Sequence, residues 1–217
     1  MSDFAARRVI MVDTQVRPSD VTKFPVIAAM LAVPRELYVP SSRVEAAYVG
    51  ENLPIAPGRV LLEARTLAKM LDGLNIQPDE MVLDVGCGYG YSTAVIARLA
   101  EAVIAVEEDA TMAAEAQAML SSERVDNAVV IAGPLVAGAA KHGPYDVMTV
   151  QGAAELVPDV LLAQLKDGGR IACLFMDGAL GVCRIGIKAG GSVTWRDAFH
   201  AGAPVLPGFG RKREFAL

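Results

Sequence analysis

The chain has 217 residues, of which 53% are hydrophobic and 21% are charged; this is typical of a folded globular protein and is long enough for one well-cored domain. The formal net charge of -5 argues against a nucleic-acid-binding protein, which usually carries a basic stripe. No apolar window has the length of a membrane span, and the N-terminal residues lack the pattern of a secretory signal. We therefore expect a cytoplasmic protein without nucleic-acid or membrane partners.

The cysteines and histidines also restrict the class of protein. Cys87, Cys173 and Cys183 are odd in number and lack C-x-x-C spacing, which fits a reducing compartment without a disulfide framework. With only His142 and His200 as imidazole ligands, we expect no metal site.

The first 80 residues predict helices and loops. Residues 24–33 and 65–74 carry apolar side chains at helical spacing, and the stretch between them is interrupted by prolines. We predict a helical N-terminal cap with acceptor-side loops over residues 1–78, attached to a Rossmann-like core over residues 79–217. Together they are expected to form a single domain, 1–217.

From residue 80 onward, short apolar runs alternate with helical patterns. Strands are predicted at 81–85, 103–106, 128–133, 145–150 and 170–176. Helices are predicted at 92–100, with Ser92 and Thr93 as capping residues, at 110–120, and from Pro158 to near Gly168. This alternation predicts an α/β fold with a doubly wound, mostly parallel sheet covered by helices on both faces. Residues 183–200, with two glycines at the centre, predict a C-terminal antiparallel hairpin.

Three alternate glycines follow the first of these strands: Gly86, Gly88 and Gly90. A dinucleotide fingerprint has the spacing G-x-G-x-x-G, but here Tyr91 stands at the place of its third glycine. Asp84 precedes the turn and would oppose a pyrophosphate, whereas it suits a ligand that carries positive charge. S-adenosylmethionine (SAM) is such a ligand, with a sulfonium, an ammonium and no phosphate.

An acid after the next strand strengthens this interpretation. Glu107 lies close to the spacing of about 20 residues past the first glycine that is expected for an acid on the ribose hydroxyls. The alternative is a glycine turn that only packs a strand on a helix, with both acids solvated. The combination of Asp84, the glycines and Glu107 favours SAM as the cofactor.

Longer stretches resemble a known family. "VLDVGCGYGYSTAVIARLA" with "VIAVEED" is similar to class I SAM-dependent methyltransferases. "AMLAVPRELYVP", "AAYVGENLPI" and "GPYDVMTVQGAAELVPDVLLAQLKDGGRIA" resemble the protein-L-isoaspartate O-methyltransferase family over roughly residues 10 to 175. The resemblance implies methyl transfer from SAM to an isoaspartyl carboxylate of a protein or peptide. Since that carboxylate is ionised at pH 7, the reaction needs in-line positioning and no general base.

The resemblance also implies a cofactor site. The glycines would admit the methionine moiety, Glu107 would hold the ribose hydroxyls, and residues around Gly133 and Gln151 would line the adenine and methyl-transfer sides. The full predicted set of cofactor-binding residues is Asp84, Gly86, Cys87, Gly88, Gly90, Ser92, Glu107, Glu108, Gly133, Pro134, Leu135 and Gln151.

The sequence departs from the family pattern at two places. The family's Thr-Ile-Ser-x-Pro on the acceptor side is here 60–64, "VLLEA", so the serine position is Leu62, which cannot donate a hydrogen bond. Val60, Leu62 and Glu63 form the predicted acceptor loop; Glu63 would repel an anionic acceptor if it pointed inward, and no catalytic residue is assigned. The family's Gly-Asp-Gly, whose acid faces the adenine, is here 133–135, "GPL".

These departures leave three interpretations open. A subfamily can solve the same task with other residues, the methyl acceptor can be a different one, or the chain can be a SAM-binding module without catalysis. The sequence does not predict the oligomeric state.

Overall fold

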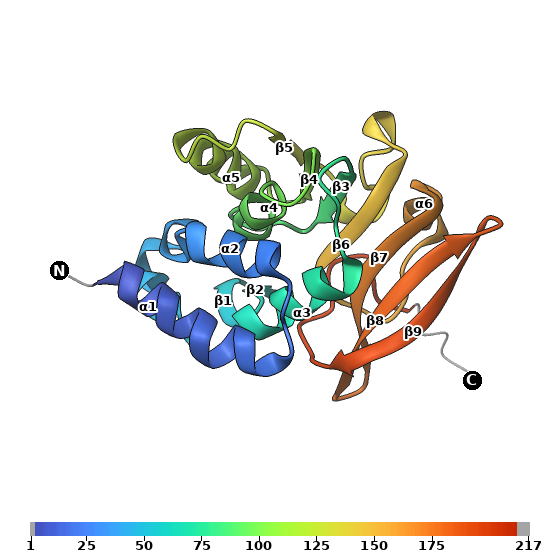
Figure 1. Cartoon of the computed structure of the whole chain (residues 1–217). Helices are drawn as coiled ribbons and strands as arrows, with labels where there is room; N and C mark the ends of the chain where they lie inside the picture. The colour runs from blue at the N-terminus through green and yellow to red at the C-terminus, as the bar shows by residue number, and fades with distance from the viewer. Residues whose placement is uncertain (1–2, 212–217) are drawn as a thin grey trace, which may run out of the picture.

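The computed structural model describes residues 3–211, and its centre is a seven-stranded sheet in the order β5-β4-β3-β6-β7-β8-β9 (Figure 1). Strands β5, β4, β3, β6 and β7 are parallel, whereas β8 is antiparallel to both β7 and β9. This confirms the predicted mostly parallel sheet with a C-terminal hairpin. The strands are β3 (Met81–Val85), β4 (Ala102–Glu107), β5 (Ala128–Ala132), β6 (Tyr145–Ala154), β7 (Leu165–Asp177), β8 (Leu180–Ala189) and β9 (Ser192–His200).

The α-helices are short or of medium length and alternate with shorter helical turns. They are α1 (Phe4–Met11), α2 (Phe24–Ala32), α3 (Ala64–Leu74), α4 (Tyr91–Ile96), α5 (Ala110–Ser122) and α6 (Asp159–Leu162). The π- and 3-10-helical turns are η1 (Val12–Val16), η2 (Arg17–Ser19), η3 (Arg35–Tyr38), η4 (Ser41–Ala46), η5 (Leu135–Ala137) and η6 (Ala140–His142). No helix within residues 3–211 combines the length and the apolar character that crossing a membrane requires.

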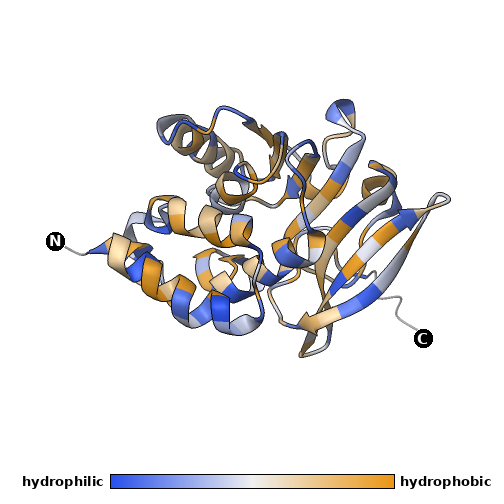
Figure 2. Ribbon diagram, viewed as in Figure 1, coloured by the Kyte–Doolittle hydropathy of each residue, from blue (hydrophilic) through white to orange (hydrophobic). Residues whose placement is uncertain are grey.

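The central strands β3, β4 and β6 are buried on both faces: their successive side chains point to opposite sides of the sheet, and a core cluster covers each side. Val82 belongs to a core cluster that it shares with α2, α3 and α4, and the next residue, Leu83, belongs to a second cluster on the other face. The second cluster contains Leu161 of α6 and Phe209 near the C-terminus. Figure 2 shows hydrophobic residues concentrated along the central strands and on the helix faces that pack together.

Two predicted helices are shorter than expected. Helix α4 spans Tyr91–Ile96 with Gly90 as its N-cap residue, so the prediction of Ser92 and Thr93 as caps was wrong; both hydroxyls turn instead to the buried Asp84. Helix α6 spans only Asp159–Leu162, because the chain enters β7 at Leu165.

A small hairpin was not predicted. β1 (Leu53–Ala56) and β2 (Arg59–Leu61) pair with each other in a separate two-stranded sheet. Their turn contains Gly58 at φ +67°, a conformation that glycine adopts without the penalty of a Cβ. The hairpin matters because it carries Arg59 toward the glycine turn.

The C-terminal segment, residues 204–209, runs back along the end of β6. Val205 forms a parallel bridge with Ala153, supported by the bonds Ala153 N–Pro204 O and Leu206 N–Ala153 O, each 2.9 Å. The carbonyl of Phe209 accepts from the amides of Glu155 and Leu156 at 2.9 and 3.1 Å. The segment thus lies against the carboxyl ends of the central strands, where ligands bind in open α/β sheets.

Candidate cofactor site

The glycine turn joins β3 to α4 at the carboxyl edge of the sheet. Gly86 has φ +79° and Gly88 has φ +59°, values that side-chain-bearing residues rarely adopt. The Gly86 amide donates to the carbonyl of Val106 at 2.8 Å, and the Gly90 amide donates to that of Cys87 at 2.9 Å. These bonds fix the turn against the end of β4 and bring it beside Glu107.

Glu107, the predicted ribose acid, lies at the end of β4 and is fully buried. Its carboxylate accepts from the amides of Gly88 at 2.8 Å, Glu108 at 2.8 Å and Asp109 at 3.2 Å. The Arg59 guanidinium then forms a bidentate ion pair with it, with Nη1–Oε1 and Nη2–Oε2 both at 2.6 Å. Nη2 also donates to the carbonyl of Gly86 at 3.0 Å.

Asp84 is the centre of a second buried polar cluster. Its Oδ2 accepts from the hydroxyls of Ser92 at 2.6 Å and Thr93 at 2.8 Å, and its Oδ1 accepts from Thr149 Oγ1 at 2.7 Å and Gln151 Nε2 at 2.8 Å. Burial raises the pKa of the Asp84 carboxyl, while these four hydrogen bonds oppose that shift. The side chain therefore ties β3 to α4 and β6, and Ser92 and Gln151 direct their polar groups to it.

The other predicted cofactor residues surround the turn. Cys87 is buried, and burial together with the nearby carboxylates raises the pKa of its thiol well above the ordinary value, so it remains protonated. Glu108 is exposed. The Gly133 amide donates to the carbonyl of Glu107 at 2.9 Å; Pro134 is exposed, whereas Leu135 is buried.

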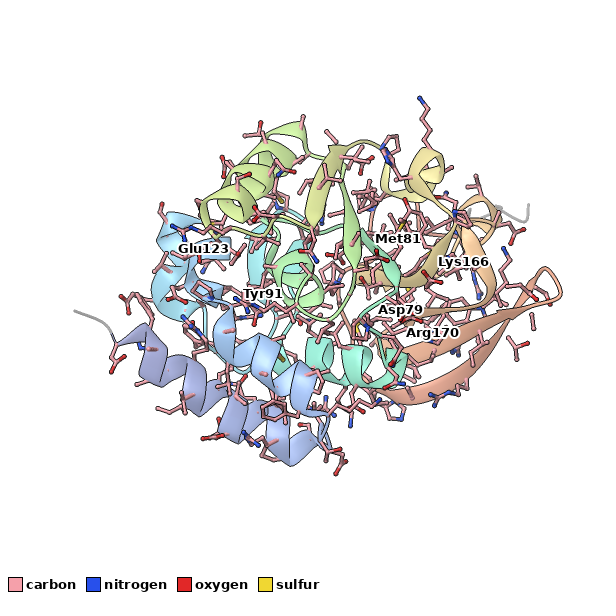
Figure 3. The ribbon with its side chains drawn as sticks, turned by 45° about the horizontal axis from the view of Figure 1, so that its top comes forward. Asp79, Met81, Tyr91, Glu123, Lys166 and Arg170 are labelled. Atoms are coloured by element: carbon pink, nitrogen blue, oxygen red, sulfur yellow. The ribbon has the colours of Figure 1, made fainter. Side chains whose placement is uncertain are left out.

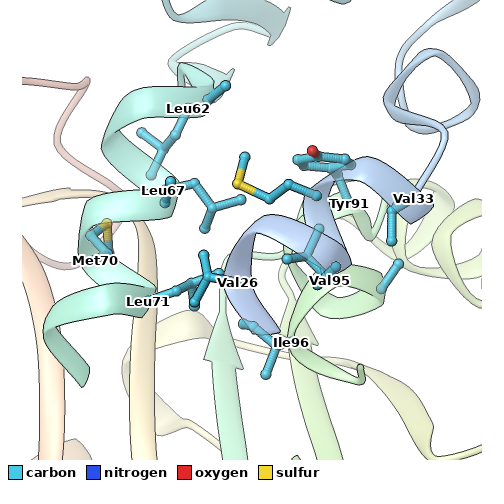
Figure 4. Packing of buried hydrophobic residues seen from close by; sticks show 14 of the residues in the cluster. Val26, Val33, Leu62, Leu67, Met70, Leu71, Tyr91, Val95 and Ile96 are labelled. Carbon is cyan, nitrogen blue, oxygen red and sulfur yellow. The ribbon is translucent and has the colours of Figure 1, made fainter. Parts of the chain in front are cut away.

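The predicted acceptor loop contributes mainly to the core. Leu62 is 2% exposed and lies with Leu67 and Tyr91 in the apolar cluster of Figure 4. Its carbonyl accepts from Nη2 of the buried Arg35 at 2.7 Å. Glu63 directly precedes α3, and its Oε1 accepts from the Thr66 hydroxyl at 2.7 Å. The Leu62 side chain is thus a packing residue.

The residue types of this site fit SAM, because Gly86 and Gly88 let a ligand approach the backbone and Glu107 offers a carboxylate to ribose hydroxyls. The described conformation places other side chains of the chain on the same surfaces. The Arg59 guanidinium pairs with both oxygens of the Glu107 carboxylate. The Ile55 side chain lies 2.8 Å from where a Cβ on Gly88 would be.

Arg59 was not predicted as a site residue. Its signal in the sequence is weak, since it lies 48 residues before Glu107 in a proline-punctuated stretch. Thr93 and Thr149 were also missed as partners of Asp84; hydroxyl residues early in a helix and inside a strand have many other roles.

The chain is similar in sequence to known methyltransferases. Residues 10–176 match the sequence model of the family "Protein-L-isoaspartate(D-aspartate) O-methyltransferase (PCMT)". A protein-L-isoaspartate O-methyltransferase of Syntrophus aciditrophicus is 34% identical over 171 residues, covering 79% of this chain and 78% of the relative. One of Methylorubrum extorquens is 36% identical over 169 residues, covering 78% of this chain and 74% of the relative.

Solved structures give the same fold. A protein-L-isoaspartate O-methyltransferase structure has a TM-score of 0.81 at 20% identity, covering 95% of this chain and 67% of that one. A Plasmodium falciparum structure described as a putative protein-L-isoaspartate O-methyltransferase in complex with S-adenosyl-L-homocysteine has a TM-score of 0.78 at 18% identity, covering 95% of this chain and 99% of that one. With the sequence relatives, these findings confirm the predicted family and its methyltransferase fold: the chain is a member of the protein-L-isoaspartate O-methyltransferase family.

Proposed function

We propose that this chain transfers a methyl group from SAM to the isoaspartyl carboxylate of a protein or peptide. The observation that carries the proposal is the glycine turn beside the buried Glu107, in a chain that belongs to this methyltransferase family. When bound, SAM would supply a methyl group on a positively charged sulfur. As the acceptor carboxylate oxygen forms its bond to the methyl carbon, the S–CH3 bond would break and neutral S-adenosylhomocysteine would leave, so no proton transfer is needed.

The proposed roles of the residues follow from their chemistry. Glu107 accepts hydrogen bonds from the ribose hydroxyls, and Gly86 and Gly88 allow the ligand close to the backbone. The backbone of 133–135 serves the adenine in place of an acidic side chain. Because an isoaspartyl carboxylate is already ionised at pH 7, the remaining task is to hold the acceptor oxygen in line with the methyl group.

The acceptor side depends on residues 60–63. Since the Leu62 side chain is buried and carries no hydroxyl, we assign the orientation of the acceptor to backbone groups of this loop. Glu63 is kept from an anionic acceptor by its hydrogen bond to Thr66 and by the Arg65 guanidinium 3.5 Å away.

A methylation assay tests the proposal. The protein is incubated with radiolabelled SAM and either an isoaspartyl peptide or the matching aspartyl peptide as control. We expect label in the isoaspartyl peptide only. In parallel, a thermal shift measures cofactor binding, since SAM at 100 times its Kd adds about 2.7 kcal/mol of stability. Absence of label together with absence of a shift would refute the proposal.

The burial of Leu62 favours a second candidate, a SAM-binding protein that methylates a different acceptor or none. A thermal shift with SAM but no label in the isoaspartyl peptide would support this candidate. The proposal also includes a cytoplasmic location, supported by the acidic composition and by three cysteines that are buried and free.

A further inference from the structure

The surface that a nucleoside would contact carries three side chains of the chain itself. Arg59 comes from β2, Ile55 from β1, and Leu206 from the C-terminal segment. Arg59 is 8% exposed, and Leu206 is 2% exposed. Residues that precede and follow the core strands in the sequence thus converge on the glycine turn after β3.

In the ion pair with Arg59, the Glu107 carboxylate has no acceptor site left for a further hydrogen bond. A carboxylate offers about four lone-pair sites, and Glu107 already accepts from three backbone amides. The two guanidinium bonds at 2.6 Å bring its donors to five. While Arg59 stays in place, the ribose hydroxyls of a nucleoside have no free acceptor on this acid.

The apolar side chains of Ile55 and Leu206 cover the glycines beside Glu107. The Leu206 Cγ lies 2.6 Å from where a Cβ on Gly152 would be, and its Cδ1 lies 3.3 Å from the same point on Gly86. Ile55 covers Gly88 in the same way. Glycines that would admit a ligand are therefore in contact with side chains of the chain.

The Arg59 guanidinium does not use all of its hydrogen-bond donors in this position. The Arg59 Nε is buried and has no hydrogen-bond partner within the described structure, which costs free energy. The hairpin that carries Arg59 pairs only with itself among the described strands, so its displacement leaves the seven-stranded sheet intact.

We propose that Arg59 sets the cofactor affinity of this protein by competing with the ribose hydroxyls for Glu107. This inference rests on the proposed function, because it takes SAM as the cofactor. SAM binds only after Arg59 leaves Glu107, so the apparent Kd equals the intrinsic Kd divided by the fraction of molecules in which Arg59 has left. Arg59 is thus an affinity-determining residue and not a catalytic one.

Isothermal titration with SAM tests the inference on the full chain. We expect Arg59→Ala to lower the Kd for SAM by about tenfold or more, because the open state no longer competes with a bidentate ion pair. Arg184→Gln is the matched control, since Arg184 pairs with Asp197 on an exposed part of β8 and β9; its Kd should equal that of the wild type. Circular dichroism checks that each variant is folded.

Arg59→Gln serves as a second variant that keeps a side chain of similar length, and Leu206→Ala opens the surface without touching the ion pair. Both should also bind SAM more tightly than the wild type. A measurable Kd that is unchanged or raised in both Arg59 variants overturns the inference, whatever Leu206→Ala shows, and leaves the proposed function intact. No binding by the wild type or any folded variant overturns the inference together with the proposed cofactor.

Discussion

The side chains that donate hydrogen bonds to the Asp84 carboxylate in the described structure are all uncharged. Two hydroxyls of α4 and two side chains of β6 hold its two oxygens. A carboxylate that accepts several such bonds is stabilised in place although it is buried. The acid that we expected to suit a cationic ligand therefore joins β3 and β6 to α4, and this sets the position of the glycine turn.

Replacing Asp84 by Asn tests this structural role. The NH2 group of the asparagine side chain is a donor and would face side chains that donate to the native carboxylate. We therefore expect the free energy of unfolding to fall by about 1–3 kcal/mol. Urea denaturation followed by circular dichroism measures it. Thr149→Val, which removes a single donor, should cost about 1 kcal/mol. Equal urea midpoints for wild type and Asp84→Asn would contradict the assigned role.

At the scale of elements, the sheet tolerates little change where β8 passes β7 and β9. A Cβ on Gly186 would lie 2.6 Å from Val193 Cγ1, 2.9 Å from Ile171 Cγ2 and 3.0 Å from Trp195 Cε3. Such distances are too short for carbon atoms, so the neighbours must move. The lack of a side chain at Gly186 thus lets β8 pack between its neighbours at this point.

We expect Gly186→Ala to destabilise the protein by about 1–3 kcal/mol through overpacking. Gly133→Ala is a suitable comparison, because a Cβ there would have no atom within 4 Å and should change stability by less than about 0.5 kcal/mol. Thermal unfolding of both variants gives the difference. Similar melting temperatures for the two variants would argue against the close packing around Gly186.

Much of the sheet could be predicted, because each central strand is a mostly apolar run bounded by turns. The β8–β9 hairpin was marked by Gly190 and Gly191. The β1–β2 hairpin could not be predicted, since its strands have four and three residues and one contains Pro54. The glycine turn and Glu107 followed from local spacing, whereas the pairing of Glu107 with Arg59 depends on where the hairpin lies in three dimensions.

At the scale of the whole molecule, Arg170 on β7 joins distant parts of the chain. It forms a bidentate pair with Glu80, with both N–O distances at 2.7 Å, and its Nε donates to the carbonyl of Leu74 at 2.7 Å. Figure 3 labels Arg170 together with Lys166, which pairs with Asp146 at 2.7 Å. These contacts connect the end of α3, the approach to β3 and the starts of β6 and β7.

The Arg170 pair should make the stability of the protein fall as the pH is lowered. Desolvation tends to raise the pKa of Glu80, but the hydrogen bonds from Arg170 and Gln77 outweigh it, and the pKa is lowered overall. A lowered folded-state pKa means that the stabilisation is complete above the unfolded value near 4.5 and is lost as the pH falls through the folded value. We expect Arg170→Gln to cost about 1–3 kcal/mol at pH 7, with a smaller difference from wild type at pH 3.

Urea unfolding at both pH values measures this change, with Arg184→Gln as a control because its ion pair is exposed. The control should differ from wild type by less than about 1 kcal/mol at either pH. A cost of Arg170→Gln that is the same at pH 3 and pH 7 would show that the ion pair with Glu80 does not contribute.

The three backbone amides on Glu107 have a kinetic consequence. They belong to the glycine turn and to the start of the segment after β4, so the carboxylate keeps its orientation when Arg59 departs. Replacing Arg59 by ribose hydroxyls at Glu107 would therefore leave the backbone hydrogen bonds of the carboxylate unchanged. Under the proposed competition, Glu107 becomes available to a nucleoside at the rate at which the Arg59 guanidinium leaves it, whatever the ligand concentration.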